Sequence, residues 1–124
     1  MANVVVWADI PVLDLERARA FYAQLLGSPV EYMPGTTEVA ILTSPGESDP
    51  MDVSADLAVG QSTPSTTHGP TIYLGSMGDI DGMVARAVEA GGKILAEKTF
   101  MAGVGWIAYI QDSEGNRIGI HQPG

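Results

Sequence analysis

The 124-residue chain contains no cysteine, which excludes disulfide bonds, thiolate catalysis and metal sites built on cysteine. Basic residues are also few, because six lysines and arginines stand against fifteen acidic residues, for a net charge of −9. Such a chain repels phosphate backbones, and no basic cluster offsets the repulsion, so we expect no nucleic-acid partner. The same charge would favour a cationic small molecule.

Long apolar runs are missing as well. No stretch approaches the roughly 20 apolar residues of a membrane-spanning helix, so we expect no membrane association. The opening MANVVVWADI has neither a basic region nor a cleavage pattern, which predicts a cytoplasmic protein without a signal peptide. The length fits one compact domain.

A pattern that occurs twice is the main positive feature. Two segments, 14–26 and 79–90, each follow an extended segment, carry apolar residues at helical spacing and end at a glycine. These glycines, Gly27 and Gly91, are 64 positions apart. Short extended segments follow each predicted helix, so each half of the chain is predicted to be a βαβββ unit.

The predicted fold class is therefore α+β, with two βαβββ modules in tandem that form a curved, open barrel-like cup with the helices outside. Module one covers about 1–60 and module two about 70–124, and a linker rich in Ser, Thr and Pro joins them at 61–69. We treat 1–124 as a single domain, because neither half alone would close a core.

Alternation along the first, fifth and last predicted strands assigns their side chains to two faces. One face is wholly apolar, as packing against a helix requires. The other mixes an indole, carboxylate, hydroxyl, phenol, guanidinium and imidazole, and it comprises Trp7, Asp9, Thr71, Tyr73, Arg117 and His121. We predict that this second face lines a ligand pocket, in which the Trp7 ring stacks on an aromatic or cationic guest.

His121 and Asp9 are the pair on this face that resembles a general base and its partner carboxylate, and they are the candidates for a catalytic role. The alternative is that His121, close to the end of the sequence, is half-solvated and has no partner. Whether the protein is an enzyme stays open at this point.

Two motifs resemble the vicinal oxygen chelate superfamily, which includes glyoxalase I, extradiol dioxygenases and bleomycin-resistance proteins. They are IPVLDLERARAFYAQLLG at 10–27 and WIAYIQDSEGNRIGI at 106–120. The opening VVWADIPV is most similar to the glyoxalase-like branch. The resemblance implies the paired βαβββ modules predicted above, and it implies a homodimer.

The resemblance also implies metal ligands at four cup-facing positions, two in each module. These positions fall on Trp7, on either Ala55 or Asp56, on Thr71 and on Gly119. Trp and Gly offer no ligand atom, Thr is a weak neutral ligand, and a lone carboxylate would not retain Zn²⁺ or Fe²⁺. We therefore predict no metal and no other cofactor.

The predicted function is binding of a small aromatic or cationic molecule in a metal-free cup, for sequestration or for metal-independent catalysis. The predicted pocket residues are Trp7, Asp9, Asp56, Thr71, Tyr73, Arg117 and His121. One alternative from the same superfamily is a divalent-metal-dependent lyase, isomerase or dioxygenase. Another is a non-catalytic dimeric module.

Overall fold

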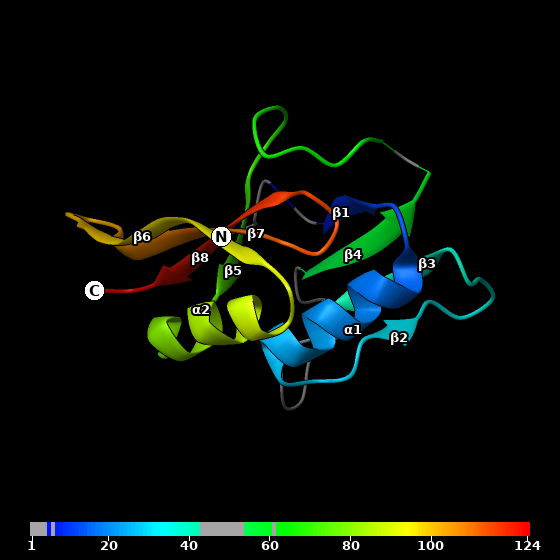
Figure 1. Cartoon of the computed structure of the whole chain (residues 1–124), viewed down its shortest axis with the longest axis horizontal. Coiled ribbons are helices and arrows are strands. Elements are labelled where there is room, and N and C mark those ends of the chain that lie inside the picture. The colour runs from blue at the N-terminus through cyan, green and yellow to red at the C-terminus, as the bar shows by residue number, and fades with distance from the viewer. Residues whose placement is uncertain (1–4, 6, 43–53, 61) are drawn as a thin grey trace.

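The computed structural model describes residue 5 and residues 7–42, 54–60 and 62–124. The start of module one at 1–4 and the first linker residue, 61, lie outside these ranges. Figure 1 shows the two modules one after the other along the chain. Module one contains β1 (Trp7–Val12), α1 (Leu15–Leu26), β2 (Glu31–Tyr32), β3 (Val39–Leu42) and β4 (Ser54–Val59). Module two contains β5 (Ile72–Gly75), α2 (Ile80–Glu89), β6 (Lys93–Met101), β7 (Gly105–Gln111) and β8 (Arg117–Gln122).

Each module forms one four-stranded sheet with the same topology. The strand orders are β1-β4-β3-β2 and β5-β8-β7-β6. The first and last strands of each module pair in parallel, and the other neighbours pair antiparallel. The predicted α+β fold of two tandem βαβββ modules is confirmed. Among the described residues no ladder joins the edge strands β1 and β5, so the sheets form no closed barrel.

The two helices begin and end where the sequence predicts. The Asp14 carboxylate accepts a hydrogen bond from the backbone N–H of Arg17 at 3.1 Å and caps α1, which ends at Gly27 in the left-handed conformation (φ 69°). The Asp79 carboxylate caps α2 in the same way, from the N–H of Gly82 at 3.0 Å. Both helices lie against the same side of the molecule, beneath the sheets (Figure 1).

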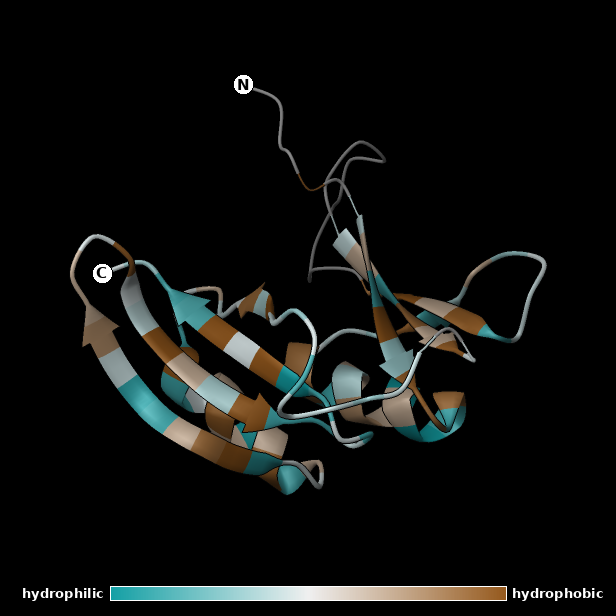
Figure 2. Cartoon of the chain, turned by 90° about the horizontal axis from the view of Figure 1, so that it is seen from above, coloured by the Kyte–Doolittle hydropathy of each residue, from teal (hydrophilic) through white to brown (hydrophobic). Residues whose placement is uncertain are grey.

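The apolar face of each sheet packs on the helices, as the alternation predicts. Figure 2 shows the two sheets standing apart from each other. The strand residues at these helix-facing positions are almost fully buried, and they include Ile10, Leu57, Ala108, Ile110, Ile118 and Ile120. The opposite face of each sheet therefore carries the mixed side chains predicted to line the pocket.

The loop between β7 and β8, residues 112–116, joins the modules; we call it the closing loop. The buried Asp112 carboxylate accepts a 2.6 Å hydrogen bond from the hydroxyl of Tyr22 on α1, and the Asn116 amide donates to the carbonyl of Pro11 at 2.7 Å. Burial first, and then the charge of Asp112, raises the pKa of Tyr22 well above its ordinary value, so this phenol stays a donor. The closing loop therefore fixes module two to the start of module one.

Candidate functional site

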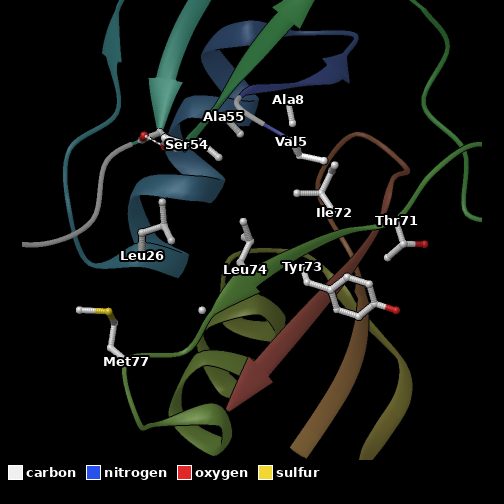
Figure 3. A pocket seen from close by; sticks show the side chains of 12 residues that line it. Val5, Ala8, Leu26, Ser54, Ala55, Thr71, Ile72, Tyr73, Leu74 and Met77 are labelled. Carbon is white, nitrogen blue, oxygen red and sulfur yellow. Dashed lines mark hydrogen bonds between the residues drawn. The ribbon is translucent and has the colours of Figure 1, made fainter. Parts of the chain in front are cut away.

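A cleft between the two modules is lined mainly by apolar side chains; we call it the inter-module cleft. Its volume is about 430 Å³, within the range of small-molecule sites. It is lined by Val5, Ala8, Leu26, Leu42, Ser54, Ala55, Thr71, Ile72, Tyr73, Leu74, Gly75 and Met77. Figure 3 shows Leu26 of α1 and Leu74 of β5 pointing into this space from the two modules.

A second cavity of about 560 Å³ lies on the open face of the module-two sheet; we call it the tyrosine pocket. Its described lining consists of Thr66, Thr67, Thr71, Tyr73, Leu95, Ala96, Tyr109 and Arg117. Thr71 and Tyr73 line both cavities, and in Figure 3 the Tyr73 ring extends away from the middle of the cleft. The two cavities therefore meet at Thr71 and Tyr73 of β5, where mainly apolar side chains line one cavity and hydroxyl groups and a guanidinium line the other.

Tyr73 is positioned by a glycine and by a second tyrosine. Its ring lies over Gly119 so closely that a Cβ at position 119 would stand 2.3 Å from Tyr73 Cδ2. Its hydroxyl lies 2.6 Å from the hydroxyl of Tyr109, and this hydrogen bond raises the pKa of Tyr73. The Tyr73 phenol therefore stays protonated, and the two tyrosines present hydroxyl groups to the tyrosine pocket.

Three predicted pocket residues come together on module one. Asp9 and Asp56 are direct partners on the parallel strands β1 and β4, and the indole N–H of Trp7 donates to Asp56 Oδ2 at 2.9 Å. Asp56 is 5% exposed, and its other oxygen, Oδ1, is buried without a hydrogen-bond partner among the described residues. Burial raises the pKa of Asp56, the Trp7 N–H opposes that rise, and the neighbouring Asp9 adds to it.

Two further predicted residues meet on module two. The Arg117 Nε donates to the hydroxyl of Thr71 at 2.8 Å, and its Nη1 donates to the carbonyl of Thr66 in the linker at 3.3 Å. Asp9 and Arg117 both line a third cavity of about 170 Å³ beside the linker, but no ion pair joins them. The predicted residues therefore form two groups, one on each module.

The structure does not bring His121 and Asp9 together as a general-base pair. The His121 Nε2 lies 2.7 Å from the carbonyl oxygen of Val104, in the turn between β6 and β7. Asp9 instead lies beside Asp56 on module one, and no hydrogen bond or ion pair between described residues links it to His121. His121 is half-buried, as the alternative expects, but it differs from that alternative in having a backbone carbonyl as its partner.

The strand register settles which residue of β4 occupies the expected metal position. Asp56 pairs with Asp9 and shares its face with Trp7, whereas Ala55 faces the helices and lines the inter-module cleft. The expected positions are therefore Trp7, Asp56, Thr71 and Gly119.

These four positions do not fit a metal ion. The Trp7 indole presents a donor, the Thr71 hydroxyl accepts from a guanidinium, and the Tyr73 ring fills the space over Gly119. Within the described ranges, no three His, Cys, Asp or Glu side chains gather in a way that would hold a metal. That the protein holds no metal stays a prediction.

Sequence reasoning predicted three residues of the tyrosine pocket and missed the other described ones, which are Thr66, Thr67, Leu95, Ala96 and Tyr109. The signal for Tyr109 was available, because strand alternation in β7 places it directly beside Gly119 on the open face. Leu95 had no such signal, because β6 pairs with β7 through register shifts between Ile94 and Ala96 and again between Ala96 and Thr99.

The comparisons with known proteins agree with this architecture. The family model described as Glyoxalase/Bleomycin resistance protein/Dioxygenase superfamily matches residues 4–120, so the chain belongs to this superfamily. No protein among the curated ones matches the sequence. Within the described ranges, neither helix has the length and apolar character needed to cross a membrane.

Solved structures share the fold at low sequence identity. A glyoxalase/bleomycin resistance protein from Albidiferax ferrireducens T118 is 23% identical, with a TM-score of 0.69 over 98% of this chain and 100% of that one. The hypothetical protein SA1046 from S. aureus is 22% identical, with a TM-score of 0.68 over 93% of each chain. A mutant of the fosfomycin resistance protein FosX from Listeria monocytogenes, in complex with Mn(II) and a dihydroxypropylphosphonic acid, is 18% identical, with a TM-score of 0.66 over 100% of this chain and 93% of that one.

Proposed function

We propose that this protein binds a small molecule with an apolar or aromatic body in the inter-module cleft, without a metal ion. The observation that carries the proposal is the position of Tyr73 between the two cavities and over Gly119. One residue thus joins an apolar chamber to a polar one and covers the position where a metal ligand is expected. This arrangement suits recognition of a whole molecule by shape and polar contacts.

Sequestration is the form of this function that the geometry favours over metal-independent catalysis. The candidate base, His121, is hydrogen-bonded to a backbone carbonyl, and its expected partner Asp9 lies on the other module. A general base must reach both its substrate and the group that orients it. A guest held between the modules would meet hydroxyl groups and apolar walls and no such pair.

Trp7 and Asp9 line neither the inter-module cleft nor the tyrosine pocket, but on the open face of β1 they could contact an aromatic or cationic part of a guest that extends beyond the cleft. Trp7 is 40% exposed on the face turned away from α1, and Asp9 is exposed beside it on the same face of β1. An indole face attracts both rings and cations, and the adjacent carboxylate adds to the second attraction. The net charge of −9 acts in the same direction.

A filled cleft tests the proposal directly. Gly75 lines the cleft, has ordinary backbone angles, and a Cβ built on it meets no atom within 4 Å, so Gly75→Phe adds a ring to open space. We expect the fluorescence of the neutral dye N-phenyl-1-naphthylamine to rise with the wild-type protein and with Leu13→Phe, an exposed control outside the cleft. Gly75→Phe should abolish the rise, and equal dye binding by all three proteins would contradict the proposal.

We also propose that the protein is a homodimer that uses strand β6. All nine residues of β6 are exposed, and four of them are large apolar residues: Ile94, Leu95, Phe100 and Met101. An exposed apolar edge strand of this length is normally covered by another chain. Light scattering at micromolar concentration should give twice the chain mass of 13.0 kDa, and a stable monomer would contradict pairing. A cytoplasmic location stays a prediction.

A further inference from the structure

Some basic residues of the protein form ion pairs with carboxylates, and others do not. Four of the six basic residues pair with carboxylates: Arg17 with Glu114, Arg19 with Glu16, Arg86 with Asp79 and Lys98 with Asp81. The other two, Lys93 and Arg117, form no ion pair with any carboxylate in the described part of the chain. In a protein with fifteen acidic residues, two cations without such partners require an explanation.

These two cations lie in one row on the open face of the module-two sheet. Arg117 pairs with Gln111 across β8 and β7, and Gln111 pairs with Lys93 across β7 and β6. Direct cross-strand partners project from the same face of a sheet, so both charges belong to the face that carries the tyrosine pocket. The next row on this face holds Tyr73, Gly119 and Tyr109.

Arg117 is held in place without being neutralised. Its hydrogen bonds to Thr71 Oγ1 and to the Thr66 carbonyl use two of its five N–H donors and involve only neutral oxygens. It lines the tyrosine pocket, whose described lining includes no carboxylate. The pocket therefore presents a fixed guanidinium with donors left over, a geometry that matches a planar oxyanion.

The tyrosine pair points to the same kind of ligand. The hydroxyls of Tyr73 and Tyr109 lie 2.6 Å apart, so one of them donates its proton to the other. The second hydroxyl keeps its own proton, which needs an acceptor. A ligand oxygen in the pocket would accept from this hydroxyl and from Arg117 together.

The charge of Arg117 inside the tyrosine pocket, and not the net charge of −9, decides whether the pocket prefers an anionic or a cationic ligand. Charges separated by more than about 8 Å are largely screened at physiological ionic strength, whereas a guanidinium in direct contact is not. We propose that the tyrosine pocket binds the oxyanion of a small organic acid, with Arg117 as its anchor, while the apolar body of the acid enters the inter-module cleft. This inference rests on the proposed function, which supplies the second half of the guest.

Calorimetric titration with three ligands that share one ring tests the inference. Benzoate, benzamide and benzylamine differ in charge and hardly in size, and phenylphosphonate serves as a second oxyanion. We expect benzoate to bind about 10- to 100-fold more tightly than benzamide, because a charge-assisted pair replaces a neutral hydrogen bond. Tight binding of phenylphosphonate in place of benzoate would equally support an oxyanion site and would identify its preferred acid.

Substitutions test whether Arg117 causes the preference for benzoate over benzamide. Arg117→Gln should remove the preference for the acid, whereas Lys98→Gln, which changes the net charge equally, should keep it, because Lys98 pairs with Asp81 of α2. If Arg117→Gln does not fold, Arg117→Lys and Tyr109→Phe should each reduce the preference at least severalfold. A preference that survives these changes, or stronger binding of benzylamine than of benzoate, would overturn the inference.

The two proposals fail in different ways. Equal binding of benzoate and benzamide, with the dye still entering the cleft, would refute the oxyanion site and leave the binding function intact. If neither the dye nor any of the four ring compounds bound, both proposals would be refuted.

Discussion

Replacement of Glu114 by glutamine tests how the closing loop joins the two modules. The Glu114 side chain is buried and accepts hydrogen bonds through both of its oxygens. Oε1 accepts from the backbone N–H groups of Leu13 and Asp14, each at 2.8 Å, and from Arg17 Nη2 at 3.0 Å. Oε2 accepts from Arg17 Nε at 2.7 Å and from the Ser113 hydroxyl at 2.9 Å. One carboxylate thus binds donors from the start of α1 and from its own loop.

The expected loss in the free energy of unfolding follows from the hydrogen bonds that a glutamine at position 114 cannot accept. Its side chain keeps one acceptor oxygen and turns the other into an NH₂ donor, which must then face either the two backbone N–H groups or Arg17. The Arg17 side chain is 52% exposed, so solvent screens its pair with Glu114 and this pair contributes little to the difference. The two backbone N–H groups lose charge-assisted bonds that contribute about 1.5 kcal/mol each. We expect Glu114→Gln to lower the free energy of unfolding by about 3 kcal/mol at pH 7.

The pH dependence separates this account from a simple loss of packing. Burial alone would raise the pKa of Glu114, but the hydrogen bonds from Arg17 and from the N–H groups of Asp14 and Leu13 outweigh it and lower the pKa below its ordinary value of 4.5. A carboxyl with a lowered folded-state pKa stabilises the protein above pH 4.5, and this contribution is lost as the pH falls through the folded value. The stability gap between wild type and Glu114→Gln should therefore narrow in acid.

Urea unfolding followed by circular dichroism measures this gap at a series of pH values. Glu16→Gln is the matched control, because it removes the same charge from an exposed pair with Arg19 and should change stability by less than about 0.5 kcal/mol. A cost for Glu114→Gln below about 1 kcal/mol at pH 7 would refute the reasoning. A gap that stays constant down to pH 3 would refute the electrostatic part of it.

Three further predictions concern the open faces of the sheets. Trp7→Ala should leave the protein folded, because the Trp7 ring is 40% exposed and turned away from α1. In a Trp106→Phe background, the same substitution should weaken the binding of an aromatic guest by about 1 to 3 kcal/mol. A largely unfolded variant in a thermal melt would place Trp7 in the core instead. Asp56→Asn should stabilise the protein relative to wild type at neutral pH and lose this advantage in acid. Because the folded-state pKa of Asp56 is raised, its carboxyl begins to cost stability as the pH rises above the ordinary aspartate pKa of the unfolded chain, and the cost is complete above the folded-state pKa. Urea titrations that show the reverse pH trend would contradict this prediction. Gly119→Ala should lower the free energy of unfolding by about 1 to 3 kcal/mol, because the added Cβ displaces the Tyr73 ring. In a Tyr73→Ala background this loss of stability should largely disappear. An unchanged loss in that background would exclude the contact between position 119 and Tyr73 as its cause.

The fold was predictable from the sequence because its signals are local and periodic. Helix caps at Asp14 and Asp79 and the apolar stripes between cap and glycine define both helices. Alternation gave the correct faces for β1, β5 and β8, which the observed registers confirm. Strand β6 was harder to predict, because all of its residues are exposed and its register with β7 shifts twice, so burial does not impose a period on it.

The site was only partly predictable, because its contacts depend on the relative placement of strands far apart in the sequence. The face of a residue can be inferred from alternation, and Trp7, Asp9 and Asp56 do lie together. Alternation does not predict which residues of one face are in contact. Arg117 is bound by the linker and His121 by the turn after β6, and the positions of these two segments cannot be inferred from alternation. The sequence motif that contains the closing loop did not predict its role, which is that Asp112 and Glu114 bind module one and hold the two modules together.

The measurement that tests the central claim most directly is a titration of the cleft dye before and after removal of metal. Elemental analysis and N-phenyl-1-naphthylamine fluorescence would be recorded on the same purified sample, first untreated and then after EDTA and desalting. We predict far less than one equivalent of any transition metal per chain and the same dissociation constant in both states, because Trp7, Thr71 and Gly119 cannot serve as strong ligands. About one metal per chain, or dye binding that EDTA abolishes and a divalent metal restores, would contradict a metal-free binding site.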